Sequence, residues 1–161
     1  MIEFRKITDD NMDECIDLKV NKGQESFVAS NILSLAEAYV YTSTYDCHVS
    51  PYAIYVDDIM VGFIKYAYWA KDERLPFGET CYHIWRLMLD KNHQGKGYGK
   101  QAVEKVIDEI KTFPHGKANS IYMSYESENA ASKKLFHSFG FVDTNKKFTV
   151  DDDEIIARFS I

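Results

Sequence analysis

DKNHQGKGYGKQAVEKVIDEI, residues 90–110, is the stretch of sequence that decides the fold. Within it Gly95, Gly97 and Gly99 alternate with other residues, and a helical pattern of apolar residues begins at once. Glycine takes backbone angles that other residues avoid, and it lets the backbone come close to a ligand. At the N-terminus of a helix, free N–H groups and the helix dipole favour an anion. The stretch therefore predicts a strand-to-helix turn that holds a phosphate group.

Known phosphate-binding loops do not match this turn. A P-loop needs a glycine where Lys100 stands, and the dinucleotide fingerprint G-x-G-x-x-G fails at the same residue. A kinase glycine loop leads into a strand, whereas a helical pattern follows here. What remains is a set of unobstructed amides at a helix start, to which Lys96 and Lys100 add positive charge. These features suit a pyrophosphate.

Composition and charge narrow the class of protein. The chain has 161 residues, of which 45% are hydrophobic, so we expect one domain over residues 1–161. The formal net charge of −6 argues against a nucleic-acid partner and permits a cationic substrate. Three cysteines without a C-x-x-C spacing favour a reducing, cytoplasmic location. No apolar run approaches the ~20 residues of a membrane span, so we expect no membrane partner.

Hydrophobic periodicity predicts an α+β fold with the order β-α-α-β-β-β-α-β-α-β-β, a mixed central β-sheet with helices on both faces. The unit around the glycine turn should join two parallel strands. Thr8 or Asp9 is the expected N-cap of the first helix, and Ser30 that of the second. Gly140 should end the last helix, and Asp57-Asp58 should form a hairpin turn. Expected strands include residues 2–7, 80–90, 120–125, 146–150 and 154–161.

Two segments carry a family resemblance. Residues 94–99, QGKGYG, resemble the Q/R-x-x-G-x-G/A motif of the GCN5-related N-acetyltransferases, the GNAT family. Residues 128–141, ENAASKKLFHSFGF, resemble the family's N-x-x-A-x-x-L-Y-x-x-x-G-F segment at the expected distance. Upstream, QESFVASNILSLAEAY and SPYAIYVDDIMVGFIKY are similar to segments of bacterial spermine/spermidine acetyltransferases. The resemblance covers essentially the whole chain and implies the GNAT fold.

The resemblance also implies acetyl-CoA as co-substrate, held between two parallel strands. Backbone groups of the central strand would pair with the pantetheine arm and polarise the thioester carbonyl, and amides of the glycine turn would hold the pyrophosphate. Carried onto this chain, the cofactor-binding positions are Leu87, Met88, Leu89, Gln94, Gly95, Lys96, Gly97, Tyr98, Gly99, Lys100, Asn129 and Lys134.

The implied reaction moves acetyl to a primary amine of a small molecule, such as spermidine or spermine, by direct attack in a ternary complex. Acetylation of a protein or peptide amine stays open, as does a non-catalytic acetyl-CoA sensor. The sensor stays open because the family's tyrosine, a proton donor to the leaving thiolate, falls at Phe136. Phenylalanine donates no proton, so the thiolate leaves unassisted or another hydroxyl serves. The candidate hydroxyls belong to Tyr98, Tyr122 and Tyr125.

The amine needs a base and a binding site. His83, which shares a strand face with Trp85, is the candidate base, with Glu79 and a water chain as alternatives. A carboxylate beside aromatic walls suits a polyamine, because it can hold one ammonium while a desolvated amine reacts. Glu37 is the chosen carboxylate, with Tyr41 and Trp85 as aromatic contacts. Histidines and cysteines show no ligand spacing, so we expect no metal. A homodimer stays open.

Overall fold

The computed structural model describes all 161 residues and has the expected order of elements. The bounds are β1 (Ile2–Lys6), α1 (Met12–Asp17), α2 (Asn31–Thr44), β2 (Cys47–Val56), β3 (Ile59–Trp69), β4 (Cys81–Leu89), α3 (Tyr98–Lys111), β5 (Ser120–Glu126), α4 (Ala130–His137), β6 (Val142–Asp143) and β7 (Glu154–Ser160).

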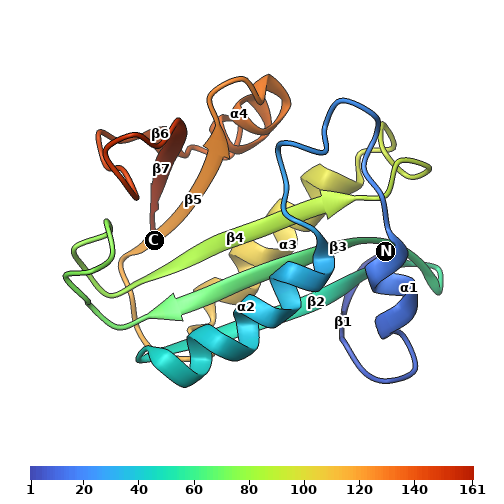
Figure 1. Cartoon of the computed structure of the whole chain (residues 1–161), viewed down its shortest axis with the longest axis horizontal. Coiled ribbons are helices and arrows are strands. Elements are labelled where there is room, and N and C mark those ends of the chain that lie inside the picture. The colour runs from blue at the N-terminus through green and yellow to red at the C-terminus, as the bar shows by residue number, and fades with distance from the viewer.

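The strands form one seven-stranded sheet in the order β1-β2-β3-β4-β5-β7-β6. The β4–β5 pair is parallel and every other pair is antiparallel, which confirms the mixed sheet and the parallel unit around the glycine turn. Helices α1 and α2 cover one face, and α3 lies behind the other (Figure 1). The largest core lies under α3 and includes Val103, Val106 and Phe136, and a smaller one under α1 and α2 includes Cys15 and Met88.

Local sequence signals explain several boundaries. Asp57 and Asp58 have φ angles of 48° and 62°, as the two central residues of a tight hairpin require. The side chain of Ser30 accepts a hydrogen bond from the N–H of Leu33 at 3.2 Å and caps α2 as expected. Gly140 has a φ of 96° just past α4, which confirms it as the residue that ends this helix.

Two expectations were wrong. Helix α1 begins at Met12 after Asn11, because the N–H groups of both residues donate to the Thr8 carbonyl in a turn that precedes the helix. Residues 146–150 are not a strand. The strand beside β7 is β6, only two residues long. Phe148 instead lies at the aromatic rings of Phe77 and His83, with ring centroids 6.1 Å from each.

A β-bulge in β4 shapes the centre of the molecule. Arg86 pairs with Lys65 and Ile84 with Tyr66, so Trp85 is an extra residue opposite β3. The bulge reverses the alternation of side chains, and Trp85 and Arg86 therefore both face α2.

The parallel pairing of β4 with β5 ends at the bulge. Its last pair is Ile84 with Met123, and beyond it the two strands diverge (Figure 1). The edge of β4 from residue 85 to residue 89 consequently has no strand partner on the β5 side, although it stays paired with β3 on the other. An unpaired strand edge carries free N–H and C=O groups that an extended ligand can bind.

Candidate active site

Three adjoining cavities follow β4 through the divergence of the strands. The loop cavity, about 400 Å³, lies between the glycine turn, β4 and α4. The junction is a narrow space that shares Leu87, Asn129, Ser132 and Phe136 with the loop cavity. The aromatic cavity, about 220 Å³, shares another set of residues with the junction. That set is Trp85, Arg86, Ser124 and Glu154.

The glycine turn presents a row of free amides to the loop cavity. Gly95 and Gly97 have φ angles of 75° and 80°, and no atom lies within 4 Å of where a Cβ would stand. The backbone N–H groups of residues 94–100 donate to no backbone carbonyl, and Gly97 begins α3 without a side-chain cap. Helix α3 starts here, so the positive end of its dipole adds to these donors. The geometry suits an anionic group.

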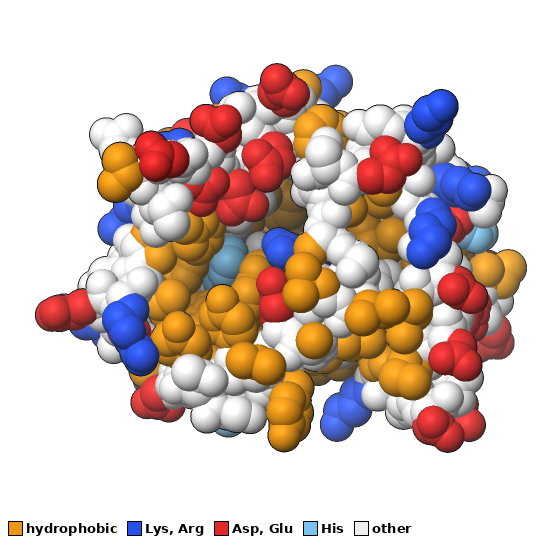
Figure 2. Space-filling model, in the orientation of Figure 1, with side chains coloured by type: hydrophobic (Ala, Val, Ile, Leu, Met, Phe, Trp, Pro, Cys, Tyr) orange, Lys and Arg blue, Asp and Glu red, His pale blue; other side chains and the backbone are white.

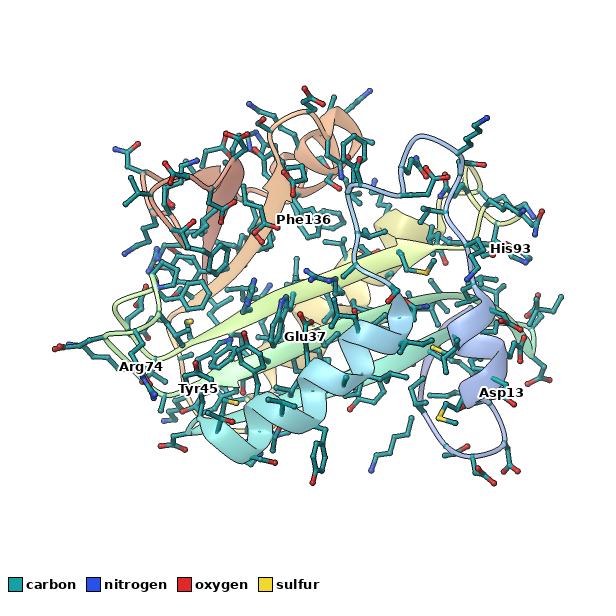
Figure 3. The ribbon with its side chains drawn as sticks, in the orientation of Figure 1. Asp13, Glu37, Tyr45, Arg74, His93 and Phe136 are labelled. Atoms are coloured by element: carbon teal, nitrogen blue, oxygen red, sulfur yellow. The ribbon has the colours of Figure 1, made fainter.

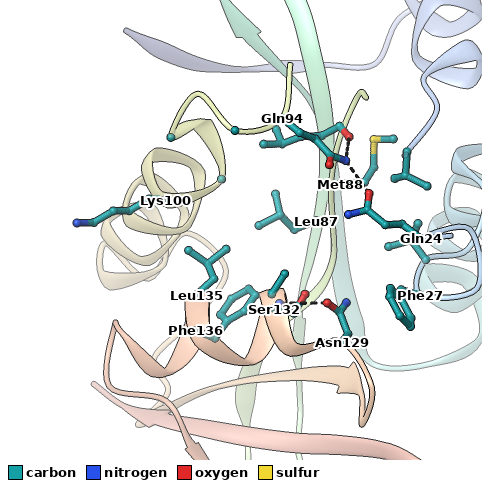
Figure 4. Close-up of a pocket in the computed structure, with 17 residues that line it drawn as sticks. Gln24, Phe27, Leu87, Met88, Gln94, Lys100, Asn129, Ser132, Leu135 and Phe136 are labelled. Carbon is teal, nitrogen blue, oxygen red and sulfur yellow. Dashed lines mark hydrogen bonds between the residues drawn. The ribbon is translucent and has the colours of Figure 1, made fainter. Parts of the chain in front are cut away.

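Gln94 fixes the turn to the rest of the site. Its Nε2 donates to the Leu89 carbonyl at 3.0 Å and to the Gln24 Oε1 at 2.9 Å, and its Oε1 accepts from the Asn21 Nδ2 at 2.7 Å (Figure 4). The side chain thus ties the end of β4 to the segment before α2. The sequence suggested the segment that begins at Gln24 and includes Phe27 for the acceptor, whereas the structure places both residues in the loop cavity. They stand about 60 to 70 residues away from β4 and the glycine turn in the chain, which is why this placement could not be predicted.

The structure brings together most of the expected cofactor-binding residues. Tyr98 packs against the core under α3, and Lys96 and Lys134 are exposed, so these three do not line the loop cavity. The residues that do line it are Leu87, Met88, Leu89, Gln94, Gly95, Gly97, Gly99, Lys100 and Asn129. Ser132, which was not predicted, follows from helical spacing because it stands four residues before Phe136 on the same face of α4.

The junction has no tyrosine hydroxyl available as an acid. Phe136 occupies the position, packed edge-to-face on Phe141 at 5.3 Å. Tyr125 donates its hydroxyl to Asp143 at 2.7 Å, and burial together with this hydrogen bond raises the pKa of Tyr125. Tyr122 donates to Glu79 at 2.8 Å. Although burial opposes it, hydrogen bonds from Tyr122 and Arg158 hold the pKa of Glu79 below its usual value, so that carboxylate is engaged elsewhere.

His83 lines the aromatic cavity as a neutral ring. It is 2% exposed and lies between Phe77 and Trp85, with ring centroids 5.1 and 5.9 Å away. The stacking on Trp85 confirms that the two side chains share a face. Neither ring nitrogen has a hydrogen-bond partner. Burial lowers the pKa of His83 to about 3, with Arg86 and Lys65 adding to the effect. So low a pKa makes His83 a weak base at neutral pH.

The expected acceptor residues do come together. Glu37, Tyr41 and Trp85 all line the aromatic cavity, where the ring of Tyr41 meets that of Trp85 edge-on at 4.9 Å. Trp69 and Phe77 complete the apolar wall. Figure 2 shows this face hollowed beside α2, with hydrophobic side chains lining the hollow and acidic side chains gathered along its upper rim.

Glu37, however, already has a cationic partner. It points from α2 toward β4 (Figure 3), and its Oε2 lies 2.6 Å from the Lys65 Nζ and 3.9 Å from Arg86. Lys65 is fully buried, with its Nζ 3.6 Å from the centre of the Trp85 ring. Burial outweighs the attraction of Glu37 and lowers the pKa of Lys65 to about 8. Sequence reasoning missed Lys65 because an alternating strand does not reveal its partner 28 residues earlier.

Comparison with known proteins defines the class. The sequence profile of the Acetyltransferase (GNAT) family matches residues 20–141, so this chain belongs to that family. It is an N-acetyltransferase, and the resemblance drawn from the glycine turn and α4 is confirmed.

The chain is similar to named acetyltransferases in sequence and in fold. The chain is 30% identical over 144 residues to the "Spermine/spermidine N(1)-acetyltransferase" of Bacillus subtilis (strain 168), covering 87% of each chain. It is 31% identical, with the same coverage, to the "Probable spermine N(1)-acetyltransferase" of Bacillus subtilis subsp. natto (strain BEST195). A solved aminoglycoside acetyltransferase AAC(6')-Ib in complex with coenzyme A shares the fold, with a TM-score of 0.75 at 14% identity over 99% of this chain and 95% of that one.

No group of three or more His, Cys, Asp or Glu side chains is arranged to hold a metal ion. None of the helices combines the length and apolar character needed to cross a membrane.

Proposed function

We propose that this chain transfers the acetyl group of acetyl-CoA to a primary amine of a polyamine such as spermidine or spermine. The observation that carries the proposal is the series of three adjoining cavities along β4. It leads from the free amides of the glycine turn to an aromatic cavity with acidic side chains. Donor and acceptor can therefore enter from opposite ends and meet at the junction.

The residues of the loop cavity suit acetyl-CoA. The free N–H groups of residues 94–100 would hold the pyrophosphate at the start of α3. The unpaired edge of β4 would bind the amide groups of the pantetheine arm as a neighbouring strand does. Asn129 accepts from the Ser132 N–H with its oxygen, which leaves its amide nitrogen free for the arm. The thioester would then lie at the junction.

The aromatic cavity suits a cationic amine. Indole and phenol rings attract an ammonium group, and burial of the group lowers its pKa and enlarges the neutral, reactive fraction. The carboxylates of Glu37, Asp152 and Glu154 outnumber Arg86 among the lining residues. The names of the relatives at about 30% identity favour a polyamine as this amine.

The burial of all three cysteines supports direct attack by the amine, without a covalent intermediate. Cys15, Cys47 and Cys81 are free and buried, and burial raises the pKa of all three thiols. A thiol held in its protonated form is a poor nucleophile, so we expect no covalent enzyme intermediate. Three free thiols also suit the reducing cytoplasm, where we propose that the protein works.

Departure of the thiolate would be unassisted by tyrosine. Phe136 fills the position from which a hydroxyl would act, and the Tyr125 hydroxyl is bound to Asp143. Thiols are far more acidic than alcohols (a cysteine thiol has a pKa of ~8.5), so the thiolate of coenzyme A leaves far more readily than an alkoxide.

The test is release of the free coenzyme A thiol from acetyl-CoA with a panel of acceptors. The panel contains spermidine, spermine, aminoglycosides and peptides with free N-termini, with acetyl-CoA alone as the blank. We expect the highest kcat/KM with the polyamines. Preference for peptides would move the activity to protein amines. Tight binding of coenzyme A without turnover of any amine would make the chain a sensor.

A further inference from the structure

Glu154 lies at the boundary between the junction and the aromatic cavity. It begins β7, and its side chain lines both the junction and the aromatic cavity. Three other residues line both spaces, namely Trp85, Arg86 and Ser124, so Glu154 is the one carboxylate among the four. A group in this position lies where an amine entering through the aromatic cavity would meet a thioester at the junction.

The carboxylate of Glu154 has no cationic partner. No Lys, Arg or His nitrogen lies within the 4.0 Å of an ion pair, whereas Glu37 is paired with Lys65 and Glu79 with Arg158. The backbone of Glu154 is nevertheless held in place. Its N–H donates to the Asp152 Oδ1 at 2.9 Å, and its carbonyl accepts from the Lys147 Nζ at 3.2 Å. A fixed backbone with a half-buried, unpaired carboxylate suits a group that exchanges a proton with a ligand.

Burial and the charged or polar groups of neighbouring elements shift the pKa of the Glu154 carboxylate. Burial raises the pKa of Glu154, and the charges of Asp152 and of Glu126, its partner on β5, act in the same direction. A hydrogen bond from Ser124 and the charge of Arg86 on β4 oppose the rise.

Three more titratable side chains line the same aromatic cavity. Burial raises the pKa of the Tyr41 phenol, which therefore stays protonated and accepts no proton. His83 is buried with both ring nitrogens unpartnered, and burial keeps it neutral, so it supplies no cation to Glu154. The carboxylate of Glu37 is already neutralised by Lys65. Glu154 is therefore the available proton acceptor beside the junction.

We propose that Glu154 accepts the proton of the acceptor's ammonium group at the junction and so acts as the general base. This inference rests on the proposed acetyl transfer to an amine. The ammonium N–H bond breaks and its proton passes to the carboxylate. The freed lone pair forms the C–N bond to the thioester carbonyl carbon, and the C–S bond breaks. The second nitrogen proton goes to the departing sulfur, and Glu154 returns its proton to water through the aromatic cavity.

The experiment compares Glu154→Gln with wild type using ethylamine, 2,2,2-trifluoroethylamine and spermidine. Trifluoroethylamine has the same carbon skeleton as ethylamine, with a bulkier end group, but it is neutral at pH 7, so it needs no base. We expect kcat/KM to fall at least about a hundredfold with ethylamine and spermidine, and less than about tenfold with trifluoroethylamine. With ethylamine the inflection of the pH profile that belongs to Glu154 should disappear, so the rate of Glu154→Gln should simply rise with pH as the free-amine fraction does. Glu154→Asp should keep part of the activity.

Control measurements separate a base from a structural residue. Glu128→Gln changes an exposed glutamate that lines none of the three cavities, and it should leave all rates near wild type. Coenzyme A affinity and melting temperature of Glu154→Gln should stay near wild type. Equal losses with both ethylamines, or a loss below threefold with all three amines, would overturn the inference. If Glu154→Gln does not fold, the same comparison of kcat/KM is made with Glu154→Asp. Its carboxylate is withdrawn by one methylene, so a general base must lose more rate with ethylamine than with trifluoroethylamine.

Failure of the proposed function has a different signature. If wild type turns over none of these amines and none of the aminoglycosides and peptides of the acceptor panel, acetyl transfer to an amine is wrong. Calorimetry with spermidine and the coenzyme A complex then tests the part of the inference that remains, the contact between Glu154 and the acceptor's ammonium group. Binding that weakens at least tenfold in Glu154→Gln supports contact between the ammonium and this carboxylate. Absent or unchanged binding overturns it.

Discussion

At the scale of single residues, burial decides what each charged side chain near the aromatic cavity can do. Glu37 has the carboxylate that a polyamine site needs, yet Lys65 already neutralises it from within the sheet. Glu154 has the same chemistry without a partner. The difference arises from which strands and helices pack together. A sequence displays the residue types but not their pairing.

Lys65→Met should remove a pH dependence of stability. In the folded protein the pKa of Lys65 is about 8, against an ordinary 10.5, so between these values the unfolded chain binds more protons. The wild-type free energy of unfolding therefore gains about 2 kcal/mol from this group as pH rises from 8 to 9.5. Below pH 8 the contribution is constant. Urea unfolding of both proteins at the two pH values checks this, and equal pH dependence would contradict it.

His83→Phe should flatten the acid side of the stability curve. The folded pKa of His83 is about 3 and the ordinary value 6.5, so the unfolded chain binds more protons as pH falls through this window. Wild type should lose about 2 kcal/mol of unfolding free energy between pH 6.5 and pH 5 from this residue, and the variant should not. Because the ring is neutral and unpartnered, turnover should fall less than about tenfold. A much larger fall in kcat with intact stability would restore His83 as the base.

At the scale of elements, the strand-to-helix turn could be read from sequence because its chemistry is local. The free amides follow from the glycines and from the start of α3, and Ser30, Asp57-Asp58 and Gly140 likewise mark ends that their own residues determine. The bulge at Trp85 could not be read, since it exists only in the register of β4 against β3. Residues 146–150 alternate like a strand, but Phe148 packs on Phe77 and on His83 of β4 rather than pairing beside β7.

The bulge explains why the site was predicted only in part. It turns Arg86 to the same face as Trp85 and frees the edge of β4 beyond it, which together create the junction. Residues taken from motifs, such as Gln94 and Asn129, fall in the site because motif and element coincide. Lys65 and Glu154 belong to no motif and enter the site only through the sheet order.

Gly97→Asp should block the anion site at the start of α3. A side chain at this residue meets open space where the ligand would lie, and an aspartate adds negative charge against a pyrophosphate. Gly97→Asn is the matched control, since it has the same shape and the same strain at a φ of 80° without the charge. Both variants should lose about 1 kcal/mol of stability from the left-handed backbone. Calorimetry should show coenzyme A affinity at least about tenfold weaker for the aspartate than for the asparagine, because each 1.4 kcal/mol of repulsion gives a factor of ten. Equal affinities would place the pyrophosphate elsewhere.

At the scale of the whole molecule, the proposed donor and acceptor would enter through separate cavities and meet at the junction. The loop cavity lies beside α3 and α4, and the aromatic cavity lies beside α2, so each proposed substrate would have its own entrance. The acidic side chains of the second entrance suit a cation, and the free amides of the first suit an anion. An architecture of this kind allows both substrates to be bound at once.

Initial-rate kinetics should therefore show a ternary complex. With acetyl-CoA and spermidine varied together, double-reciprocal plots should intersect, because no acetyl group is passed to the protein before the amine binds. Cys15→Ala, Cys47→Ala and Cys81→Ala, each made singly, should keep most of the turnover, since all three thiols are buried with raised pKa values. Cys81 is the most informative of these residues because it lies on β4 itself. It belongs to the same buried cluster as Trp69 and Phe77, which line the aromatic cavity, so its variant tests for a nucleophile beside the proposed acceptor site. Parallel lines, or an acetylated cysteine found by mass spectrometry after acetyl-CoA alone, would replace direct attack with a covalent intermediate.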